Sequence, residues 1–510
     1  MKHTLPLLAL VCSAFAADTP KTLIEISSRF TETDAKTGKV DLLSAPRITT
    51  REGCRATIEI TRETHAALPE TAVKDALIDF TTGIVLDVTA WMEGDDVILR
   101  GIATMRELDG EMKAARDGMW AHLRVDEVPF VLRLKSGEPR DLPLATSARS
   151  DRMLTIQITA KNHVPVNASP LYWQAFAAMP KLDDAEKRLL DAKSPTPGDA
   201  ERALVAKADA ALKLFAEASR ADFCEWNLDL AKGPSLALPH LGPLRDIAKL
   251  ALLKARLGDA RAASDQHAQV LLMARHVAAT PLLISRLVGI SIETMAIESA
   301  AAMLPQWDEK TPDFLVYVVQ YVEPAPSIAE CVAAEGKNMS AWLSVELDAE
   351  VKKSGAALDV RAWLGQLLAP IDQNSDEVLK QLGTLPKDEA GVRKLIEDYR
   401  TQMTELARII GLPREEMKKE AAAFEQTAKT DAQRNVFIAL LAPAVLKARE
   451  SELKGEARLA LLRAALDVQA KGESALPADR ATYRKTEHGF ELTSKEQFDG
   501  KPVVLTVGPR

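Results

Sequence analysis

The sequence lacks the compact motifs by which many enzymes are identified from primary structure. It has no HExxH zinc motif, no GxSxG nucleophile turn, no P-loop, no EF-hand loop and no CxxC pair. An SxxK match at 451–454 and a KTG match at 36–38 lie in the reverse order and far apart for a penicillin-recognising serine enzyme. We therefore predict no catalytic residue, no metal ligand and no cofactor, and we favour a non-enzymatic role.

A basic excess is also lacking. The chain has 65 Lys and Arg residues against 73 Asp and Glu residues, which gives a net charge of −8 at pH 7. Nucleic-acid binding depends on clustered Lys and Arg side chains that neutralise phosphates. The composition therefore argues against a nucleic-acid partner.

Long apolar runs are confined to the N-terminus. The stretch MKHTLPLLALVCSAFAADTP has one Lys, an apolar core and small residues before a cut after Ala16, which is typical of a secretory signal peptide over 1–16. Lipoprotein processing at Cys12 is less favoured, because Val11 and not a small residue precedes it. The best later run, 436–446, falls short of the roughly 18 apolar residues of a membrane helix. We expect an exported bacterial protein, periplasmic or extracellular, without a transmembrane helix in the mature chain.

Cysteine is scarce. Of four cysteines, Cys54, Cys224 and Cys331 remain after the expected cleavage. An odd number allows at most one internal disulfide in an oxidising compartment, so a bond between Cys224 and Cys331 stays open. Three separate buried thiols are the favoured interpretation.

Residues 22–165 follow the two-residue period of β-strands. Ala56, Ile58 and Ile60 point to one side of an extended segment, and the polar residues between them point to the other. The same alternation returns at 84–89, 130–135 and 154–159. We therefore predict an antiparallel β-rich domain.

Two stretches of this domain resemble the β-domain of secretins, the ring-forming outer-membrane proteins of secretion systems. They are LLSAPRITTREGCRATIEI at 42–60 and TGIVLDVTAWMEGDDVILRGIA at 82–103. The resemblance implies a secretin-like β domain over 22–165 that docks to a partner or self-associates. The alternative is that SAPRITT forms only a tight corner, with its proline placed where no ladder donor is needed.

The candidate binding edge follows from this resemblance and from the exposed backbone groups that every sheet edge carries. Its residues are Ser44, Pro46, Arg47, Ile48, Thr49 and Thr50. Either the helical half of the chain covers this edge or a partner strand pairs with it by β-augmentation. We expect proline at position 48 or 50 to remove a ladder donor and abolish association.

Past residue 166 the apolar period changes to that of helices. One apolar face covers 244–255, Gly258 and Asp259 break the helix, and a second face follows at 260–277. These segments predict an antiparallel helical hairpin similar to that of tetratricopeptide repeats, without their regular period of about 34 residues.

Three phrases in this half resemble a family of uncharacterised, exported, helical bacterial proteins. They are FCEWNLDLAKGPSLALPHLGPLRDIAKLALLKARLGDA at 223–260, ATPLLISRLVGISIE at 279–293 and YRKTEHGFEL at 483–492. The family has no established activity, so the resemblance implies none. The predicted fold is α+β, in which an irregular α-helical domain over 166–475 precedes a C-terminal β-hairpin tail over 480–510.

Histidines are the remaining candidates for chemistry. His267 and His276 lie nine residues apart, so at about 100° per residue they project from opposite faces of a helix and cannot share a metal ion. His267 lies on an apolar face and is interpreted as a core histidine. His240 is the strongest candidate, but no thiol or hydroxyl lies near it in sequence. Cys224 and Trp226 are expected to anchor their segment to the helical core.

Two functions remain open. The favoured one is a non-catalytic, exported envelope protein with a docking β domain and a helical scaffold, whose partner is another protein or a second copy of the chain. The alternative is an envelope hydrolase with a site in a groove between the two domains. A deep pocket with converging His, Asp or Glu side chains favours the enzyme, and an unpaired strand edge favours the scaffold.

Overall fold

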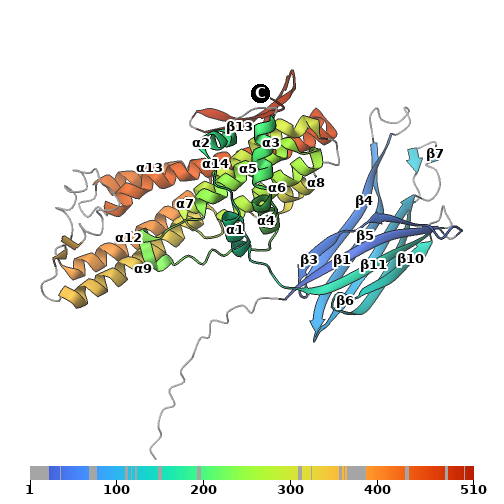
Figure 1. Ribbon diagram of the computed structural model, residues 1–510, viewed down its shortest axis with the longest axis horizontal. Coiled ribbons are helices and arrows are strands. Elements are labelled where there is room, and N and C mark those ends of the chain that lie inside the picture. The colour runs from blue at the N-terminus through green and yellow to red at the C-terminus, as the bar shows by residue number, and fades with distance from the viewer. Residues whose placement is uncertain are drawn as a thin grey trace, which may run out of the picture. The chain divides into compact units, whose positions relative to one another are not determined.

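Figure 1 shows the computed structural model of the chain. It describes residues 22–34, 36–67, 77–108, 113–115, 118–120, 123–146, 152–191, 197–307, 313–322, 324–354, 359–360, 362–363, 386, 388–430, 436–476, 480–498 and 500–509. The signal peptide expected over 1–16 lies outside these residues. The chain divides into two compact units, 1–165 and 166–510, each with its own hydrophobic core.

The first unit is a sandwich of two antiparallel sheets. One sheet has the strand order β10-β11-β1-β2, with β3 also paired to β1, and the other has the order β4-β5-β6-β9. The strands are β1 (Leu23–Asp34), β2 (Val40–Ser44), β3 (Arg47–Arg51), β4 (Arg55–Ala67), β5 (Leu77–Glu93), β6 (Asp96–Leu108), β9 (Leu123–Lys135), β10 (Pro139–Thr146) and β11 (Arg152–His163), with a small hairpin of β7 (Lys113–Ala115) and β8 (Gly118–Trp120). Inward side chains of both sheets form one core, which confirms the predicted antiparallel β-rich domain.

Alternation along each strand decides which side chains fill this core. Ile24 and Ile26 of β1 are fully buried, and so are Ile156 and Ile158 on the paired strand β11. Burial of each such side chain contributes about 1.5–3 kcal/mol. Between β5 and β6, Gly94 takes a φ of 64°, the left-handed conformation that a two-residue hairpin turn requires.

The second unit is a helical bundle. Its helices are α1 (Ala168–Ala177), α2 (Asp184–Asp191), α3 (Asp199–Lys207), α4 (Asp209–Ser219), α5 (Leu241–Leu257), α6 (Ala260–Val277), α7 (Leu283–Met303), α8 (Asp313–Tyr321), α9 (Ile328–Ser354), α12 (Glu389–Ile410), α13 (Arg414–Thr430) and α14 (Val436–Lys471), with 3₁₀ turns η1 (Leu230–Ser235), η2 (Leu304–Gln306) and η4 (Glu473–Ala475). One core cluster gathers α5, α6, α7 and α14, and a second joins α7 with α9, α12, α13 and α14. The predicted α+β fold class is therefore confirmed.

The helical hairpin predicted at 244–277 is formed by α5 and α6. Asp259 caps α6, because its carboxylate accepts a hydrogen bond from Ala262 N at 2.8 Å. The next helix, α7, approaches α6 closely at Gly289, where a Cβ atom would lie only 2.9 Å from Ala274 O. Glycine therefore permits this helix crossing.

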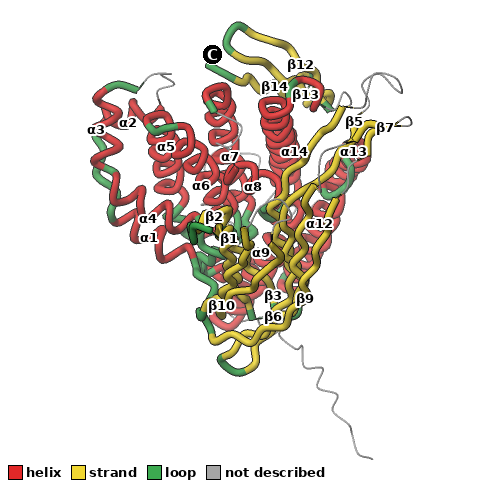
Figure 2. Tube along the Cα trace, turned by 90° about the vertical axis from the view of Figure 1, so that its right-hand side faces the viewer, coloured by secondary structure: helices red, strands yellow, loops and turns green. Residues whose placement is uncertain are grey.

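The predicted C-terminal β tail is a three-stranded sheet, in which one further strand extends the expected β-hairpin. Its strands are β12 (Ala481–Thr486), β13 (Gly489–Phe498) and β14 (Lys501–Val507), in that order (Figure 2). The third strand is held because Leu505 pairs with Leu492 in the helical core and Gly508 N donates to Ala301 O of α7 at 2.9 Å. The sheet is thus part of the second unit's core.

One apolar helix departs from the prediction that the mature chain has no segment suited to span a membrane. The segment Leu283–Gln306 is long and apolar enough to cross a membrane by length and composition, because it contains an 18-residue window with a mean hydropathy of 1.5, although we expected no such segment after residue 16. A core helix meets the same criteria. In this structure α7 packs against α6, α9 and α14 and carries the paired charges Arg286 and Glu293.

The cysteines form no disulfide among the described residues. Cys224 and Cys331 are free and buried, as expected for separate thiols, and the bond left open between them is not formed. Cys54 is also free but exposed, so its expected burial is wrong. It lies in the turn between β3 and β4, outside the alternating part of either strand.

Candidate functional site

The predicted binding residues lie on one edge of the first sheet. β2 pairs with the second half of β1 and β3 with its first half, and no other described strand pairs with the outer side of either. Ala45 and Pro46 interrupt the edge between them. We call the resulting interrupted strand, residues 40–51, the β2–β3 edge.

Two hydrogen bonds fix the direction of the backbone groups in β3. Ser28 N donates to Pro46 O at 3.0 Å, and Glu52 N donates to Thr22 O at 2.9 Å. Neighbouring antiparallel strands bond at every second residue, and the residues between direct their N–H and C=O groups to the other side. The even-numbered residues of β3 therefore bond to β1, and the odd-numbered residues face away from the sheet.

This register corrects the prediction about proline substitutions. The N–H groups of Ile48 and Thr50 belong to the ladder with β1, so proline there would damage the sheet itself. The donors that a partner strand would use are the N–H groups of Arg47, Thr49 and Arg51. Sequence alternation could not give this result, because it leaves the hydrogen-bonding phase undefined.

The six predicted residues divide between the two faces of the sheet. Thr50 is buried, and Ile48 packs against the sandwich core. Arg47 and Thr49 are exposed, on the opposite face. Ser44 and Pro46 are half-buried beside the interruption.

The β2 half of the edge is apolar and exposed. Val40 is 56% exposed, Leu42 is 53% exposed and Leu43 is 48% exposed. Natural sheets usually protect their edges with charge, proline or a bulge, and this one has an irregular register between Phe30 and Thr31 as well as the proline. Exposed apolar side chains that remain beside an edge favour contact with another polypeptide.

The β3 half is basic on its exposed face. Glu25, buried under longer side chains, lies 3.3 Å from Arg47 Nε and 3.3 Å from Lys161 Nζ, and 3.6 Å from His163 Nδ1. Arg51 adds a further exposed cation. Arg47 and Lys161 therefore share one carboxylate, and Arg51 lies beyond it on the same strand, although the whole chain has a net charge of −8.

His240 lies in a packing cluster and not in a catalytic pair. Its ring is fully buried and stacks on Trp226, with ring centroids 4.3 Å apart. Neither ring nitrogen has a hydrogen-bond partner within the described part of the chain. Burial lowers the pKa of His240 to about 4, so the ring is neutral at pH 7.

Trp226 and Cys224 belong to the same cluster. The Trp226 indole donates to His276 O at 2.9 Å and stacks with Tyr172, whose hydroxyl lies 3.0 Å from His276 Nδ1. Burial raises the pKa of the Cys224 thiol to about 12, which leaves it unreactive. These contacts anchor the segment to the helical core.

His267 has a hydroxyl partner that the sequence did not indicate. Its Nε2 lies 2.9 Å from Ser299 Oγ and its Nδ1 lies 2.6 Å from Ala263 O. Burial lowers the pKa of His267 to about 4, which makes it a weak base. Ser299 lies within α7, where backbone N–H groups are bonded along the helix and cannot stabilise an oxyanion. The pair is that of a satisfied core histidine.

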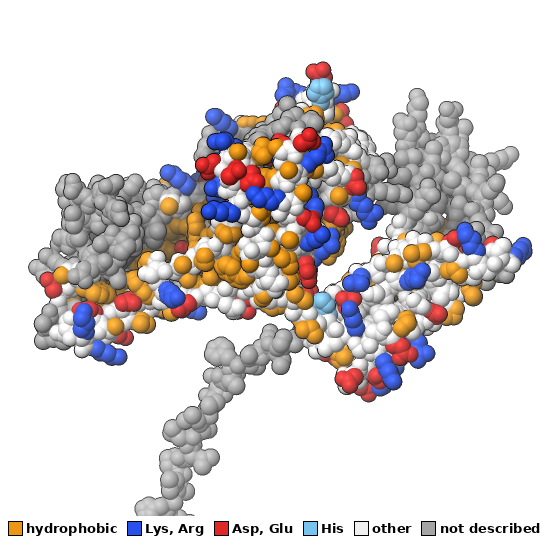
Figure 3. Space-filling view, in the orientation of Figure 1, with side chains coloured by type: hydrophobic (Ala, Val, Ile, Leu, Met, Phe, Trp, Pro, Cys, Tyr) orange, Lys and Arg blue, Asp and Glu red, His pale blue; other side chains and the backbone are white. Residues whose placement is uncertain are grey.

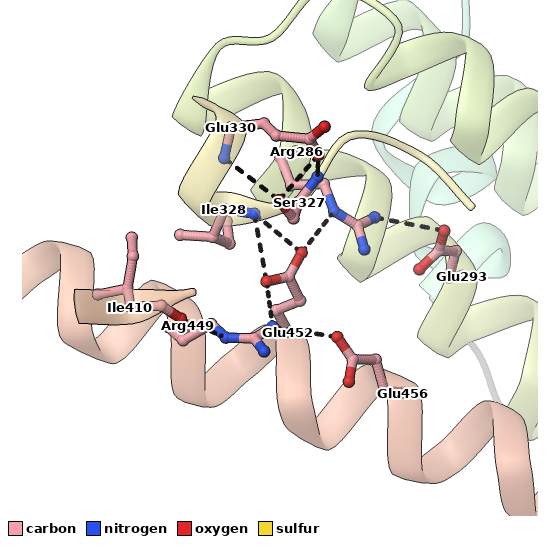
Figure 4. Close-up of polar contacts among 9 residues, drawn as sticks. All are labelled: Arg286, Glu293, Ser327, Ile328, Glu330, Ile410, Arg449, Glu452 and Glu456. Atoms are coloured by element: carbon pink, nitrogen blue, oxygen red, sulfur yellow. Dashed lines mark hydrogen bonds and ion pairs between the residues drawn. The ribbon is translucent and has the colours of Figure 1, made fainter. Parts of the chain in front are cut away.

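A buried ion-pair network joins α7, α9 and α14 (Figure 4). Glu452 accepts hydrogen bonds from Arg286 Nε at 3.2 Å and from Arg449 Nη1 at 2.6 Å. Its two oxygens also lie 3.0 and 3.2 Å from Ile328 N, the first amide of α9. Glu293, whose pKa is raised by burial, lies 3.4 Å from Arg286 Nη1. The network caps one helix and binds three together, which is a structural role.

An open groove of about 550 Å³ between α9 and α12 is lined by exposed and half-buried side chains: Ala333, Lys337, Arg400, Thr401, Thr404 and Glu405. Among the residues that the structure describes, no three His, Cys, Asp or Glu side chains are placed to hold a metal ion. Figure 3 shows both signs of charge interspersed over the visible face of the helical unit.

Comparisons with known proteins give partial structural likeness alone. No family model and no curated protein matches the sequence. Solved structures similar to the chain include ExeD of Aeromonas hydrophila, with 12% identity, a TM-score of 0.20, and coverage of 31% of this chain and 53% of that chain. The secretin domain of InvG from the Salmonella injectisome matches at 11% identity with a TM-score of 0.18, and the match covers 35% of this chain and 68% of that chain. GspD of enteropathogenic Escherichia coli matches at 9% identity with a TM-score of 0.17, and the match covers 34% of this chain and 74% of that chain.

These neighbours are secretins, but the match is limited. It spans about a third of this chain and about half the length of ExeD. At such TM-scores the likeness carries no conclusion about activity, partners or compartment. The resemblance of 223–492 to exported helical proteins stays a prediction.

Proposed function

We propose that this chain is an exported, non-catalytic envelope protein whose β unit docks an extended segment of another polypeptide at the β2–β3 edge. In this proposal the helical unit is a binding scaffold, and the β unit recruits the docked segment to it. The observation that carries the proposal is the outward direction of the Arg47, Thr49 and Arg51 N–H groups, which have no partner strand among the described residues. Such a row of groups is the template for β-augmentation.

Export rests on the signal-peptide pattern over 1–16 and is part of the proposal. The exposed apolar side chains of β2 support docking, because they extend the contact beyond the backbone ladder. The hydrolase alternative stays a hypothesis. A hydrolase would need a catalytic base, for which His240 and His267 are the candidates. His240 has no hydroxyl or thiol partner among the described residues. His267 contacts the Ser299 hydroxyl, but the backbone N–H groups around Ser299 are bonded within α7 and cannot stabilise an oxyanion.

The proposal is tested by crosslinking in the native envelope. A photoreactive residue replaces Leu42, and the crosslinked product is identified by mass spectrometry in three backgrounds: unchanged, Thr49→Pro and Thr49→Ala. Proline removes the outward N–H, whereas alanine keeps it and changes the same side chain. We expect a product that forms with alanine and is lost with proline.

A thermal melt of each variant separates lost docking from lost folding. Proline is tolerated on an edge strand where its N–H faces outward, so the two Thr49 variants should melt within a few degrees of each other. An identical product in all three backgrounds contradicts docking at this edge. So does a crosslink from position 42 to residues 166–510 of the same chain, because the helical unit would then cover the edge.

A further inference from the structure

The charges of β3 make this edge a poor match for a second copy of itself. Antiparallel pairing of two β3 strands centred on Thr49 aligns the outward backbone groups of both, since residues 47 and 51 then lie opposite each other. This register places Arg47 of one copy opposite Arg51 of the other, twice. Like charges directly opposite each other on one face of a sheet are destabilising.

The Glu25 carboxylate does not remove this repulsion. It is already shared by Arg47 and Lys161, both at 3.3 Å, and Arg51 has no ion-pair partner among the described residues, so β3 keeps an excess of positive charge. The Arg47 side chain remains 67% exposed. Both arginines are therefore available to a strand laid along β3.

We infer that the partner of the β2–β3 edge is an acidic extended segment and not a second copy of this chain. The inference rests on the proposed function. In either strand direction, the residues that lie beside Arg47 and Arg51 on the same face are four positions apart, about 13 Å. The segment recognised therefore carries Asp or Glu at positions i and i+4, with a small or β-branched residue between them beside Thr49.

Each charge pair also sets specificity. An acidic side chain opposite each arginine contributes a favourable cross-strand pair, and a lysine in its place is repelled. Because the pairs are exposed, they act mainly on selection and association rate and weaken as salt rises. Backbone pairing supplies the common part of the affinity.

The test uses two labelled peptides, VEVTVEV and VKVTVKV, titrated against the full mature chain at low salt by fluorescence anisotropy. We expect the acidic peptide to bind at least tenfold more tightly than the basic one, from two pairs that change sign. Arg51→Glu should bring the two affinities within about threefold, because one attractive and one repulsive pair then act on each peptide. Thr49→Pro should abolish binding of both peptides, and Thr49→Ala should not.

Self-association gives a second readout. By sedimentation, the unchanged chain should show no dimer that depends on residue 49. Arg51→Glu should favour a dimer, since a carboxylate then lies opposite Arg47 of the other copy, and adding Thr49→Pro should remove it.

The outcomes separate the two proposals. If the basic peptide binds as tightly as the acidic one and both are lost with Thr49→Pro, the edge docks strands but the acidic partner is wrong. A dimer of the unchanged chain that Thr49→Pro dissolves also overturns the acidic partner in favour of self-pairing. If neither peptide binds, or if Thr49→Pro changes nothing, docking at this edge is itself wrong.

Discussion

Replacing Glu452 with alanine should be among the most destabilising single changes in the helical unit. The Glu452 side chain is 1% exposed and accepts hydrogen bonds from Arg286, Arg449 and the amide of Ile328. Removing one member of a buried ion pair leaves the other charge uncompensated, which costs about 3–5 kcal/mol. The orphaned Ile328 amide is part of the same loss, because α9 loses its N-terminal cap.

Glu456→Ala is the matched control. Glu456 accepts from the same Arg449 Nη1 at 3.1 Å, but its side chain is 56% exposed. An exposed ion pair contributes about 0–1 kcal/mol. Urea unfolding of the full chain, followed by circular dichroism at a helix wavelength, compares both variants with the unchanged protein.

Two results would refute this reasoning. Equal free energies of unfolding for the Glu452 and Glu456 variants would show that the carboxylate of Glu452 is not a buried partner. A Glu452→Gln variant as stable as the original would show that its charge is irrelevant, because glutamine keeps an acceptor for Ile328 but cannot neutralise Arg286.

Three further predictions concern the rest of the chain. Intact-mass measurement of native protein should show a start at Ala17, and a lipid on Cys12 would contradict cleavage there. The free energy of unfolding should fall by about 1.4 kcal/mol per pH unit for each buried histidine such as His267 between pH 6.5 and about 4, because the folded ring, with a pKa of about 4, binds its proton only after unfolding; urea titrations with no such slope would contradict this. Gly233→Ala should destabilise more than Gly472→Ala in thermal melts, because both have positive φ but only the first places a Cβ against the indole ring of Trp342; equal losses would show that the ring moves aside.

The apolar periodicity of the sequence predicted strands and helices correctly where one face of the element is buried. The alternation at 56–60 lies within β4, and the apolar faces of 244–277 form the α5–α6 hairpin. Burial of one face leaves a clear two-residue or 3.6-residue period, which a single sequence displays. The position of SAPRITT on a sheet edge is consistent with its proline.

What sequence could not predict depends on contacts between distant segments. Arg286 and Glu452 are 166 residues apart, and each looks like an ordinary helical charge. The sequence did carry a signal for Arg286, because an arginine inside the apolar stretch LISRLVGISIE needs a charged partner when it is buried. The sequence-based prediction also placed the outward N–H groups at residues 48 and 50, whereas the structure places one at Thr49. A contact with another strand decides this, because the hydrogen bond from Ser28 of β1 fixes which residues of β3 bond to β1.

The most direct test of the account is amide hydrogen exchange resolved to single residues along β3 in the full mature chain. The account predicts fast exchange at Arg47, Thr49 and Arg51 and slow exchange at Ile48 and Thr50, because only the latter pair donates to β1. Addition of the acidic peptide should slow the three fast amides and leave the other two unchanged. Slow exchange at Thr49 in the chain without peptide would mean that the edge is already covered, and this would contradict a free docking edge.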